Sequence, residues 1–297
     1  MVERFSCAER SLALGEPCYG TASQVRRWLL VEQPGAWGAT AVMESGLPIE
    51  VATRLRAIAR GCGARLLLIR RHGRSAPERR SAFAVTSTAD IRRVERFWFD
   101  DPAQLLAVDW APLLTFDAVG GEVVDDPLYL VCTNGSHDAC CARFGRPVAK
   151  ALDSVVGDHV WEASHFGGDR FAGNLVALPD GIYYGRVTPD NASRLIELHR
   201  GGRIDPAHLR GRSFQPFVAQ AAEHFVRLEH GLEHIDEVAA GAVADLGDGM
   251  FRVGVATAAG TTLAVTVACS EAVDPQQLTC RSTSEEHPPR YRLVELA

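Results

Sequence analysis

Cysteine thiols, an imidazole and a carboxylate stand in two loop-like segments near the middle of the chain. Cys132 is followed eight and nine residues later by the adjacent pair Cys140 and Cys141, and His165 and Asp169 come next, on either side of a Gly-Gly pair. These side-chain types are the usual protein ligands of transition metals. One helix-sized and one strand-sized segment separate the two loops, so a β-α-β unit would bring them together. The spacing predicts a metal site.

The elements around these residues follow the order β-α-β-β-β-α. The apolar pattern predicts strands at 128–132, 159–163, 174–178 and 182–187, and helices at 141–156 and from Pro189 onward. The intervening Pro179-Asp180-Gly181 is typical of a hairpin turn. Cys132 is therefore expected at the end of a buried strand and Cys141 at the start of a helix.

An earlier part of the chain repeats this order. Strands are expected at 26–32, 65–70, 82–86 and 94–99, and helices at 47–61 and 101–106. The two copies predict an α/β fold of tandem thioredoxin-like units, of which only the second carries the candidate ligands.

A further helix and a small β-rich region are expected to complete the chain. The helix is predicted from 214 to about 238, and alternating segments follow at 250–257, 261–268 and 291–295. We therefore expect three parts: 1–125 without ligands, 126–238 with the metal site, and 239–297 as a small β appendage.

Composition is typical of a folded, soluble protein. The chain has 297 residues, of which 46% are hydrophobic and 23% charged, and no apolar run approaches the length of a membrane span. Charge in the first ten residues argues against a signal peptide, so the cytoplasm is the expected location. Thiols stay reduced there, so the eight cysteines are interpreted as ligands, redox groups or core residues rather than as disulfides.

Net charge limits the partners. A value of −6 argues against general nucleic-acid binding. The segment 65–80 is nevertheless rich in arginine, and two interpretations remain open: a solvated loop face, or a docking surface for an acidic redox partner protein. Its basic residues are Arg65, Arg70, Arg71, Arg74, Arg79 and Arg80, set against the single acid Glu78.

Several stretches of the chain resemble the thioredoxin-like ferredoxins and, more closely, the sucrase/ferredoxin-like family. The most specific is Cys-Thr-Asn-Gly-Ser-His-Asp-Ala-Cys-Cys at 132–141. Similar residues continue at 161–165, 168–174 and 178–181, and earlier ones stand at 15–17, 27–32 and 68–71. The resemblance implies a thioredoxin-like fold and a 2Fe-2S cluster bound by two cysteines and two histidines.

Carried over by position, the resemblance makes Cys132, Cys141 and His165 cluster ligands. Asp169 occupies the place of the second histidine, where this chain departs from the family pattern. With Asp169 as the fourth ligand, the oxidised centre would carry one negative charge, between all-thiolate and two-histidine clusters. Its reduction potential is then expected between roughly −400 mV and about −150 mV.

Cys140 is an alternative fourth ligand, although adjacent residues usually point apart.

Three functions remain open on these residues. The first is a 2Fe-2S protein in electron transfer or redox sensing, and so an electron carrier rather than a stand-alone enzyme. The second is a thiol-based redox enzyme using Cys140 or Cys141, and the third is a structural zinc site.

Overall fold

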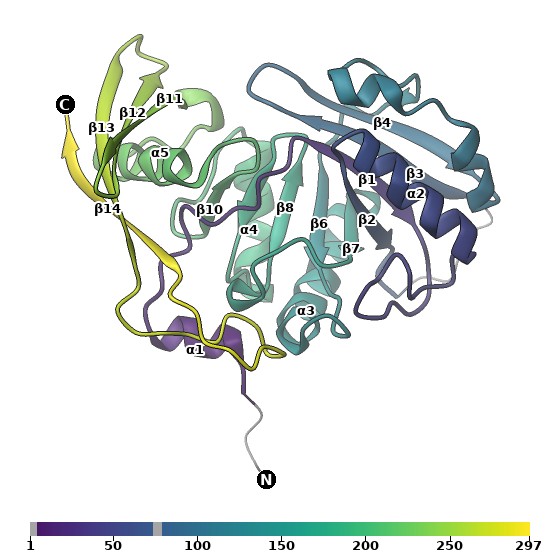
Figure 1. Cartoon of the computed structure of the whole chain (residues 1–297). Coiled ribbons are helices and arrows are strands. Elements are labelled where there is room, and N and C mark those ends of the chain that lie inside the picture. The colour runs from purple at the N-terminus through teal and green to yellow at the C-terminus, as the bar shows by residue number, and fades with distance from the viewer. Residues whose placement is uncertain (1–4, 74–78) are drawn as a thin grey trace.

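The structure, a computed structural model, describes residues 5–73 and 79–297. It is a mixed α/β protein with one large curled sheet and a second, antiparallel sheet at the C-terminal end (Figure 1). The large sheet has ten strands in the order β10-β9-β8-β6-β7-β2-β1-β3-β4-β5, and the small sheet has the order β11-β12-β13-β14. Within the described ranges, no helix is long and apolar enough to cross a membrane.

The first half of the chain contributes five strands and four helical segments to this fold. They are α1 (Cys7–Ala13), β1 (Arg27–Glu32), α2 (Ile49–Gly61), β2 (Arg65–Arg70), β3 (Arg80–Ser87), β4 (Arg92–Phe99), the 3-10 helices η1 (Pro102–Ala107) and η2 (Ala111–Thr115), and β5 (Glu122–Val123).

The second half carries the candidate ligands and the small sheet. Its elements are β6 (Leu128–Cys132), α3 (Ala139–Val156), η3 (Gly157–His159), β7 (Val160–Ala163), η4 (Asp169–Phe171), β8 (Leu175–Leu178), β9 (Ile182–Tyr184), α4 (Pro189–Arg200), β10 (Leu209–Arg212), α5 (Phe217–His230), η5 (Ile235–Glu237), β11 (Val238–Gly247), β12 (Met250–Thr257), β13 (Thr262–Glu271) and β14 (Pro289–Leu296).

Strand pairing in the two halves follows the same scheme. β1 pairs parallel with β2 and antiparallel with β3, which pairs with β4. β6 likewise pairs parallel with β7 and antiparallel with β8, which pairs with β9. The two sets join antiparallel through β2 and β7, where Ile69 lies opposite Ala163 and Arg70 opposite Glu162. The expected α/β class is confirmed, while the thioredoxin-like identity of each half and the three-part division remain predictions.

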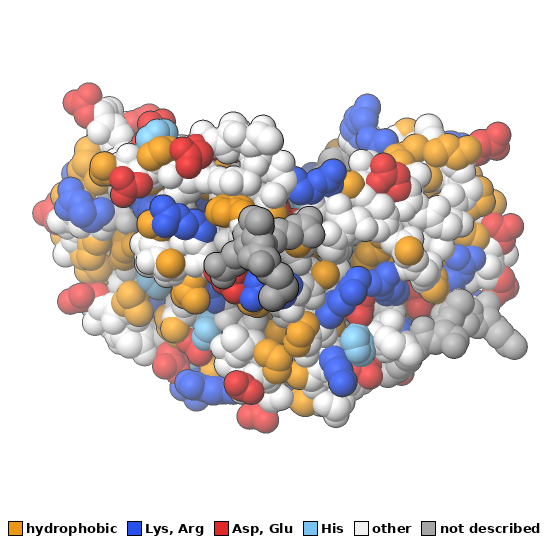
Figure 2. All heavy atoms as spheres, turned by 90° about the horizontal axis from the view of Figure 1, so that it is seen from below, with side chains coloured by type: hydrophobic (Ala, Val, Ile, Leu, Met, Phe, Trp, Pro, Cys, Tyr) orange, Lys and Arg blue, Asp and Glu red, His pale blue; other side chains and the backbone are white. Residues whose placement is uncertain are grey.

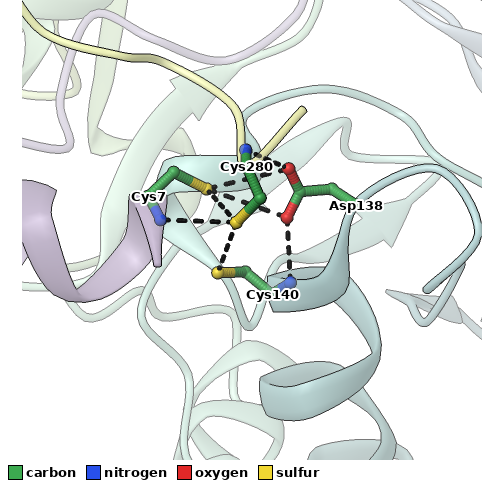
Figure 3. A group of neighbouring side chains, drawn as sticks. All are labelled: Cys7, Asp138, Cys140 and Cys280. Atoms are coloured by element: carbon green, nitrogen blue, oxygen red, sulfur yellow. Dashed lines mark hydrogen bonds between the residues drawn. The ribbon is translucent and has the colours of Figure 1, made fainter. Parts of the chain in front are cut away.

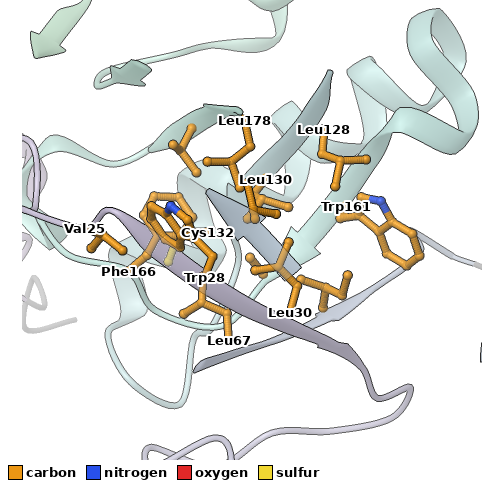
Figure 4. Packing of buried hydrophobic residues seen from close by; sticks show 14 of the residues in the cluster. Val25, Trp28, Leu30, Leu67, Leu128, Leu130, Cys132, Trp161, Phe166 and Leu178 are labelled. Carbon is orange, nitrogen blue, oxygen red and sulfur yellow. The ribbon is translucent and has the colours of Figure 1, made fainter. Parts of the chain in front are cut away.

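The inner face of the curled sheet holds one core built from both halves. Trp28 and Leu30 from β1 pack in the same cluster as Leu128 and Leu130 from β6 (Figure 4). Cys132 belongs to this cluster because it lies on the same face of β6 as those leucines. The first candidate ligand is therefore anchored in the central core.

Helices cover the outer faces of the sheet. The apolar residues of α3 and α4 pack on β6, β8 and β9, and those of α2, η1 and η2 pack on the strands of the first half. The short helix expected at 101–106 is η1, a 3-10 helix in which Asp101 and Gln104 form a capping box. The packing of α3 on β6 places the start of this helix beside the end of the strand.

The predicted helix from 214 to about 238 is wrong at its C-terminal end. α5 ends at His230, because Gly231 adopts a left-handed conformation with φ 64° and ends the helix. The chain then passes through η5 into β11, which begins at Val238. The apolar face of α5 packs on the small sheet, so the expected β appendage is confirmed as a four-stranded sheet with its own helix.

The N-terminal segment lies against the second half of the chain, although it was expected in the same part as β1. Its Glu16 accepts hydrogen bonds from Arg170 and from Arg290 of β14, each at 2.9 Å. Arg186 in turn donates to the carbonyl of Glu16 at 2.5 Å. The N-terminal and C-terminal segments thus meet beside η4.

Candidate metal centre

Cys132 and Cys141 meet where β6 ends and α3 begins. Asp138 caps α3, with its side chain accepting the backbone N–H of Cys140 at 2.8 Å. One turn further along α3, Gly145 faces the backbone of Cys132, and a Cβ there would collide with the Cys132 carbonyl. Both thiols are buried. The missing side chain at Gly145 therefore lets the helix bring Cys141 to the end of the strand.

His165 and Asp169 are held by the turn that follows β7. Gly167 and Gly168 both have positive φ, 108° and 84°, which favours glycine and brings the imidazole and the carboxylate to the same side. The buried Arg210 donates to the carbonyl of Gly167 at 3.1 Å and fixes the turn. Burial lowers the pKa of Arg210 to about 10.

The four side chains predicted as ligands come together. His165 Nδ1 lies 3.9 Å from the sulfur of Cys132 and 3.8 Å from that of Cys141. Asp169 Oδ1 lies 2.9 Å from His165 Nδ1 and accepts a hydrogen bond from the Cys141 thiol at 3.0 Å. The imidazole of His165 is thus placed within reach of both thiols.

His137, which the sequence interpretation left out, joins the same group. Its ring stacks on that of His165 with 3.8 Å between centroids, and its Nε2 lies 3.8 Å from Asp169 Oδ2. The side chains of His137 and His165 are 35% and 21% exposed, whereas both thiols are buried. The centre therefore has a buried sulfur side and an exposed imidazole side. The available signal for His137 was its position inside the motif between Cys132 and Cys141.

The protonation of these groups is mutually dependent. The hydrogen bond from Cys141 lowers the pKa of the Cys132 thiol to about 5, and the same contact, together with burial, raises that of Cys141. Burial opposes the protonation of His165, but its hydrogen bond with Asp169 and its contact with Cys132 raise the pKa to about 9. Burial likewise disfavours ionised Asp169, but the hydrogen bond with His165 lowers its pKa. These directions favour a thiolate at Cys132 and a carboxylate at Asp169, the forms that bind metals.

Cys140, the alternative ligand, lies in a different group. Its sulfur is 3.4 Å from that of Cys280, which is 3.5 Å from the sulfur of Cys7, with Asp138 beside them (Figure 3). The hydrogen bond from Cys7 lowers the pKa of Cys140 to about 6, while burial raises that of Cys280 to about 12. Among the described residues, Cys140 and Cys141 therefore belong to different groups of candidate metal ligands, although they are adjacent in the sequence.

The arginine-rich segment lies partly outside the described residues, since 74–78 are not described. Arg65 donates to the carbonyl of Phe166 at 2.7 Å, and Arg70 pairs with the buried Glu162 at 2.7 Å. Arg65 thus holds the backbone next to His165, and Arg70 binds a side chain of β7, the strand that precedes it. On the α1 and α3 side of the molecule, the described basic and acidic side chains are interspersed (Figure 2).

Comparison with known proteins identifies the family. The chain belongs to the sucrase/ferredoxin-like family, whose model matches residues 18–211. Two solved structures, both cysteine-to-serine variants of the thioredoxin-like [2Fe-2S] ferredoxin from Aquifex aeolicus, match at 20% and 21% identity. Each match covers 28% of this chain and 97% of the ferredoxin, with a TM-score of 0.26. A search of curated proteins finds no match.

Proposed function

We propose that this protein binds a 2Fe-2S cluster through Cys132, Cys141, His165 and Asp169 and acts in electron transfer or redox sensing. The observation that carries the proposal is the convergence of two buried thiols with an imidazole and a carboxylate held on the opposite loop. Two thiols with nitrogen or oxygen ligands on the other side are a donor set that a two-iron centre accepts. The cluster would supply one-electron chemistry, and the protein would supply burial and ligand charge.

The site can hold a 2Fe-2S cluster only if His165 and Asp169 move away from the two thiols. His165 Nδ1 lies within 3.9 Å of both sulfurs, and Asp169 contacts His165 and Cys141, so a two-iron core is larger than the space between these atoms. The thiols are buried in the core, whereas His165 is partly exposed and stands just before the Gly167-Gly168 turn. An outward movement of His165 and Asp169 would open the site without disturbing β6 or α3.

The fourth ligand has a second candidate in His137. Its contact with His165 and Asp169 places it on the same side of the centre. Coordination by His137 would leave Asp169 as a hydrogen-bond acceptor for His165, a role that outer carboxylates commonly have at metal sites. The centre would then be neutral when oxidised rather than singly negative.

The exposed imidazole side of the centre also indicates where a redox partner protein would bind. Electrons must enter or leave through the part of the centre nearest to solvent, and here that part is formed by His137 and His165. A redox partner protein is therefore expected to dock over these two rings. The buried thiol side would shield the cluster from water.

Anaerobic purification followed by iron and sulfide analysis and paramagnetic resonance of the reduced protein tests the proposal. We expect about two irons and two sulfides per chain. Cys132→Ser should abolish the signal, while the control Cys269→Ser, which lies in neither ligand group, should leave it intact. Asp169→Ala and His137→Ala identify the fourth ligand. Only the variant that removes the true ligand should change the paramagnetic resonance spectrum strongly.

A single zinc ion is the second candidate for this centre. The ligand atoms of Cys132, Cys141 and His165 lie within 4.8 Å of one another, a spacing that suits one ion as they stand. Colourless protein with zinc lost in Cys132→Ser would favour this candidate and reject the cluster. Colourless, metal-free protein with reactive Cys140 or Cys141 would instead favour a thiol-based enzyme.

A further inference from the structure

A second group of ligands lies where three distant parts of the chain meet. Cys7 begins α1, Asp138 and Cys140 stand at the start of α3, and Cys280 lies on the segment between β13 and β14. Figure 3 shows the four side chains pointing toward a common centre. We propose that this group, called here the terminal clamp, binds one divalent cation of the zinc type and fastens both end segments of the chain to α3.

Spacing within the terminal clamp suits a single tetrahedral ion. The sulfur of Cys280 lies 3.4 Å from that of Cys140 and 3.5 Å from that of Cys7. The carboxylate oxygens of Asp138 lie 3.8 and 3.9 Å from the Cys7 sulfur. Zinc–sulfur bonds of about 2.3 Å place tetrahedral thiolates roughly 3.8 Å apart, within a few tenths of an ångström of these values.

A two-iron cluster would fit the terminal clamp only if its ligands moved apart, as at the first centre, whereas one ion fits them as they stand. Such a core spreads its four ligands over two metal atoms, whereas all four ligand atoms of the terminal clamp lie within 4.8 Å of one another. Three thiols and one carboxylate also complete a four-coordinate shell. A closed shell of this kind is typical of structural zinc sites, which keep no position for a substrate.

Electrostatics favour a cation at this place. Cys7, Cys140 and Asp138 are buried, and Cys280 is half-buried, so four acidic groups share a space with little water. Backbone N–H groups already orient the ligands: that of Cys280 donates to Asp138 at 2.6 Å, and that of Cys7 donates to the Cys280 sulfur at 3.4 Å. Such N–H donors stabilise thiolate and carboxylate charge, and a divalent ion would neutralise part of what remains.

The position of the terminal clamp suggests its role. Residues 7 and 280 are 273 positions apart, yet α1 and the segment before β14 lie side by side at the start of α3 (Figure 1). Cys140 of the clamp adjoins Cys141 of the first centre. A bound ion would hold the two end segments on the helix that carries a cluster ligand. The inference does not rest on the identity of the metal in the first centre.

Metal analysis of the full chain as purified without added chelator tests the proposal. We expect the terminal clamp to contribute about one zinc per chain, which Cys280→Ser should remove and Cys269→Ser should leave in place. Cobalt exchanged into the unaltered protein should give thiolate-to-cobalt charge-transfer absorption, and Cys280→Ser should remove it. Iron and sulfide content should stay unchanged in Cys280→Ser, which separates this result from a failure of the proposed function.

Alkylation of the unaltered protein supplies a test that needs no variant. Cys7, Cys140 and Cys280 should react with iodoacetamide slowly before chelation and at least tenfold faster afterwards, as read by peptide mass spectrometry. The proposal is overturned if zinc is absent from the unaltered protein, or if it is lost in Cys132→Ser and retained in Cys280→Ser. A Cys140–Cys280 disulfide in anaerobically purified protein would overturn it as well.

Discussion

Gly145 lies against the carbonyl of Cys132 with no room for a side chain between α3 and β6. The atom in the way is backbone, so a rotamer change cannot relieve the collision. The helix must shift away from the strand if any side chain is introduced at this position. Cys141 would move with the helix, and the two buried thiols would separate.

Gly145→Ala is therefore expected to lower stability and metal retention together. Overpacking of this kind costs about 1–3 kcal/mol, and here it also changes the spacing between the two thiols. Iron content and thermal unfolding should both decrease. Gly61→Ala is a matched control, because Gly61 ends α2 with open space around it and alanine favours helix. Equal iron retention in the two variants would contradict the account of Gly145.

Asp169→His should raise the reduction potential of the proposed cluster. With Asp169 as the fourth ligand, the exchange removes one negative charge from the oxidised centre and moves the potential from the intermediate range toward about −150 mV or above. A redox titration followed by visible absorption measures the change. Asp125→His makes the same exchange at an exposed position and should shift the potential little. A potential unchanged in Asp169→His would indicate that Asp169 does not bind iron.

Much of the first centre was predictable because its residues are close in the sequence. Cys132 and Cys141 flank one loop, and His165 and Asp169 stand one turn of chain apart, so the expected β-α-β order was sufficient to bring them together. His137 was not predicted, because its stacking on His165 depends on the path of the loop after β6 rather than on periodicity.

The remaining contacts depend on long-range packing that local patterns do not encode. Cys7 and Cys280 meet Cys140 only because both ends of the chain fold back onto α3. The joining of the two halves through β2 and β7 was not predictable either, because the charges of Arg70 and Glu162 do not by themselves say which strands pair. β10 was missed because Leu-Arg-Gly-Arg lacks the alternation of a half-buried strand.

Glu16→Ala should destabilise the docking of the N-terminal segment. The carboxylate of Glu16 is fully buried and accepts hydrogen bonds from Ser11 at 2.7 Å and from Arg170 and Arg290 at 2.9 Å. Its removal leaves two partly buried guanidinium groups without their anion, which costs about 2–4 kcal/mol. Urea unfolding measures the loss. Glu9→Ala is the matched control, because the Glu9–Arg143 pair is exposed and its loss should be within experimental error.

Stability is expected to fall in mild acid because of His224. This side chain is buried in α5 and stacks on Tyr19 with 4.2 Å between ring centroids, and its Nδ1 has no hydrogen-bond partner. Burial, with a smaller contribution from Arg227, lowers its pKa to about 4. The unfolded chain takes up a proton near pH 6.5, whereas the folded protein does so only near its lowered pKa. The contribution of neutral, buried His224 to the free energy of unfolding is therefore fully present above about pH 6.5 and is lost as the pH falls toward 4.

Replacing the imidazole of His224 isolates its contribution to the pH dependence of stability. His224→Phe keeps the stacking on Tyr19 and removes the titrating group, so the difference in unfolding free energy between pH 7.5 and pH 5 should shrink by about 2 kcal/mol relative to the unaltered protein. His230→Phe, at an exposed position of the same helix, should leave that difference unchanged. Urea unfolding at the two pH values gives both numbers. The same pH dependence in His224→Phe as in the unaltered protein would show that the acid sensitivity arises from another group.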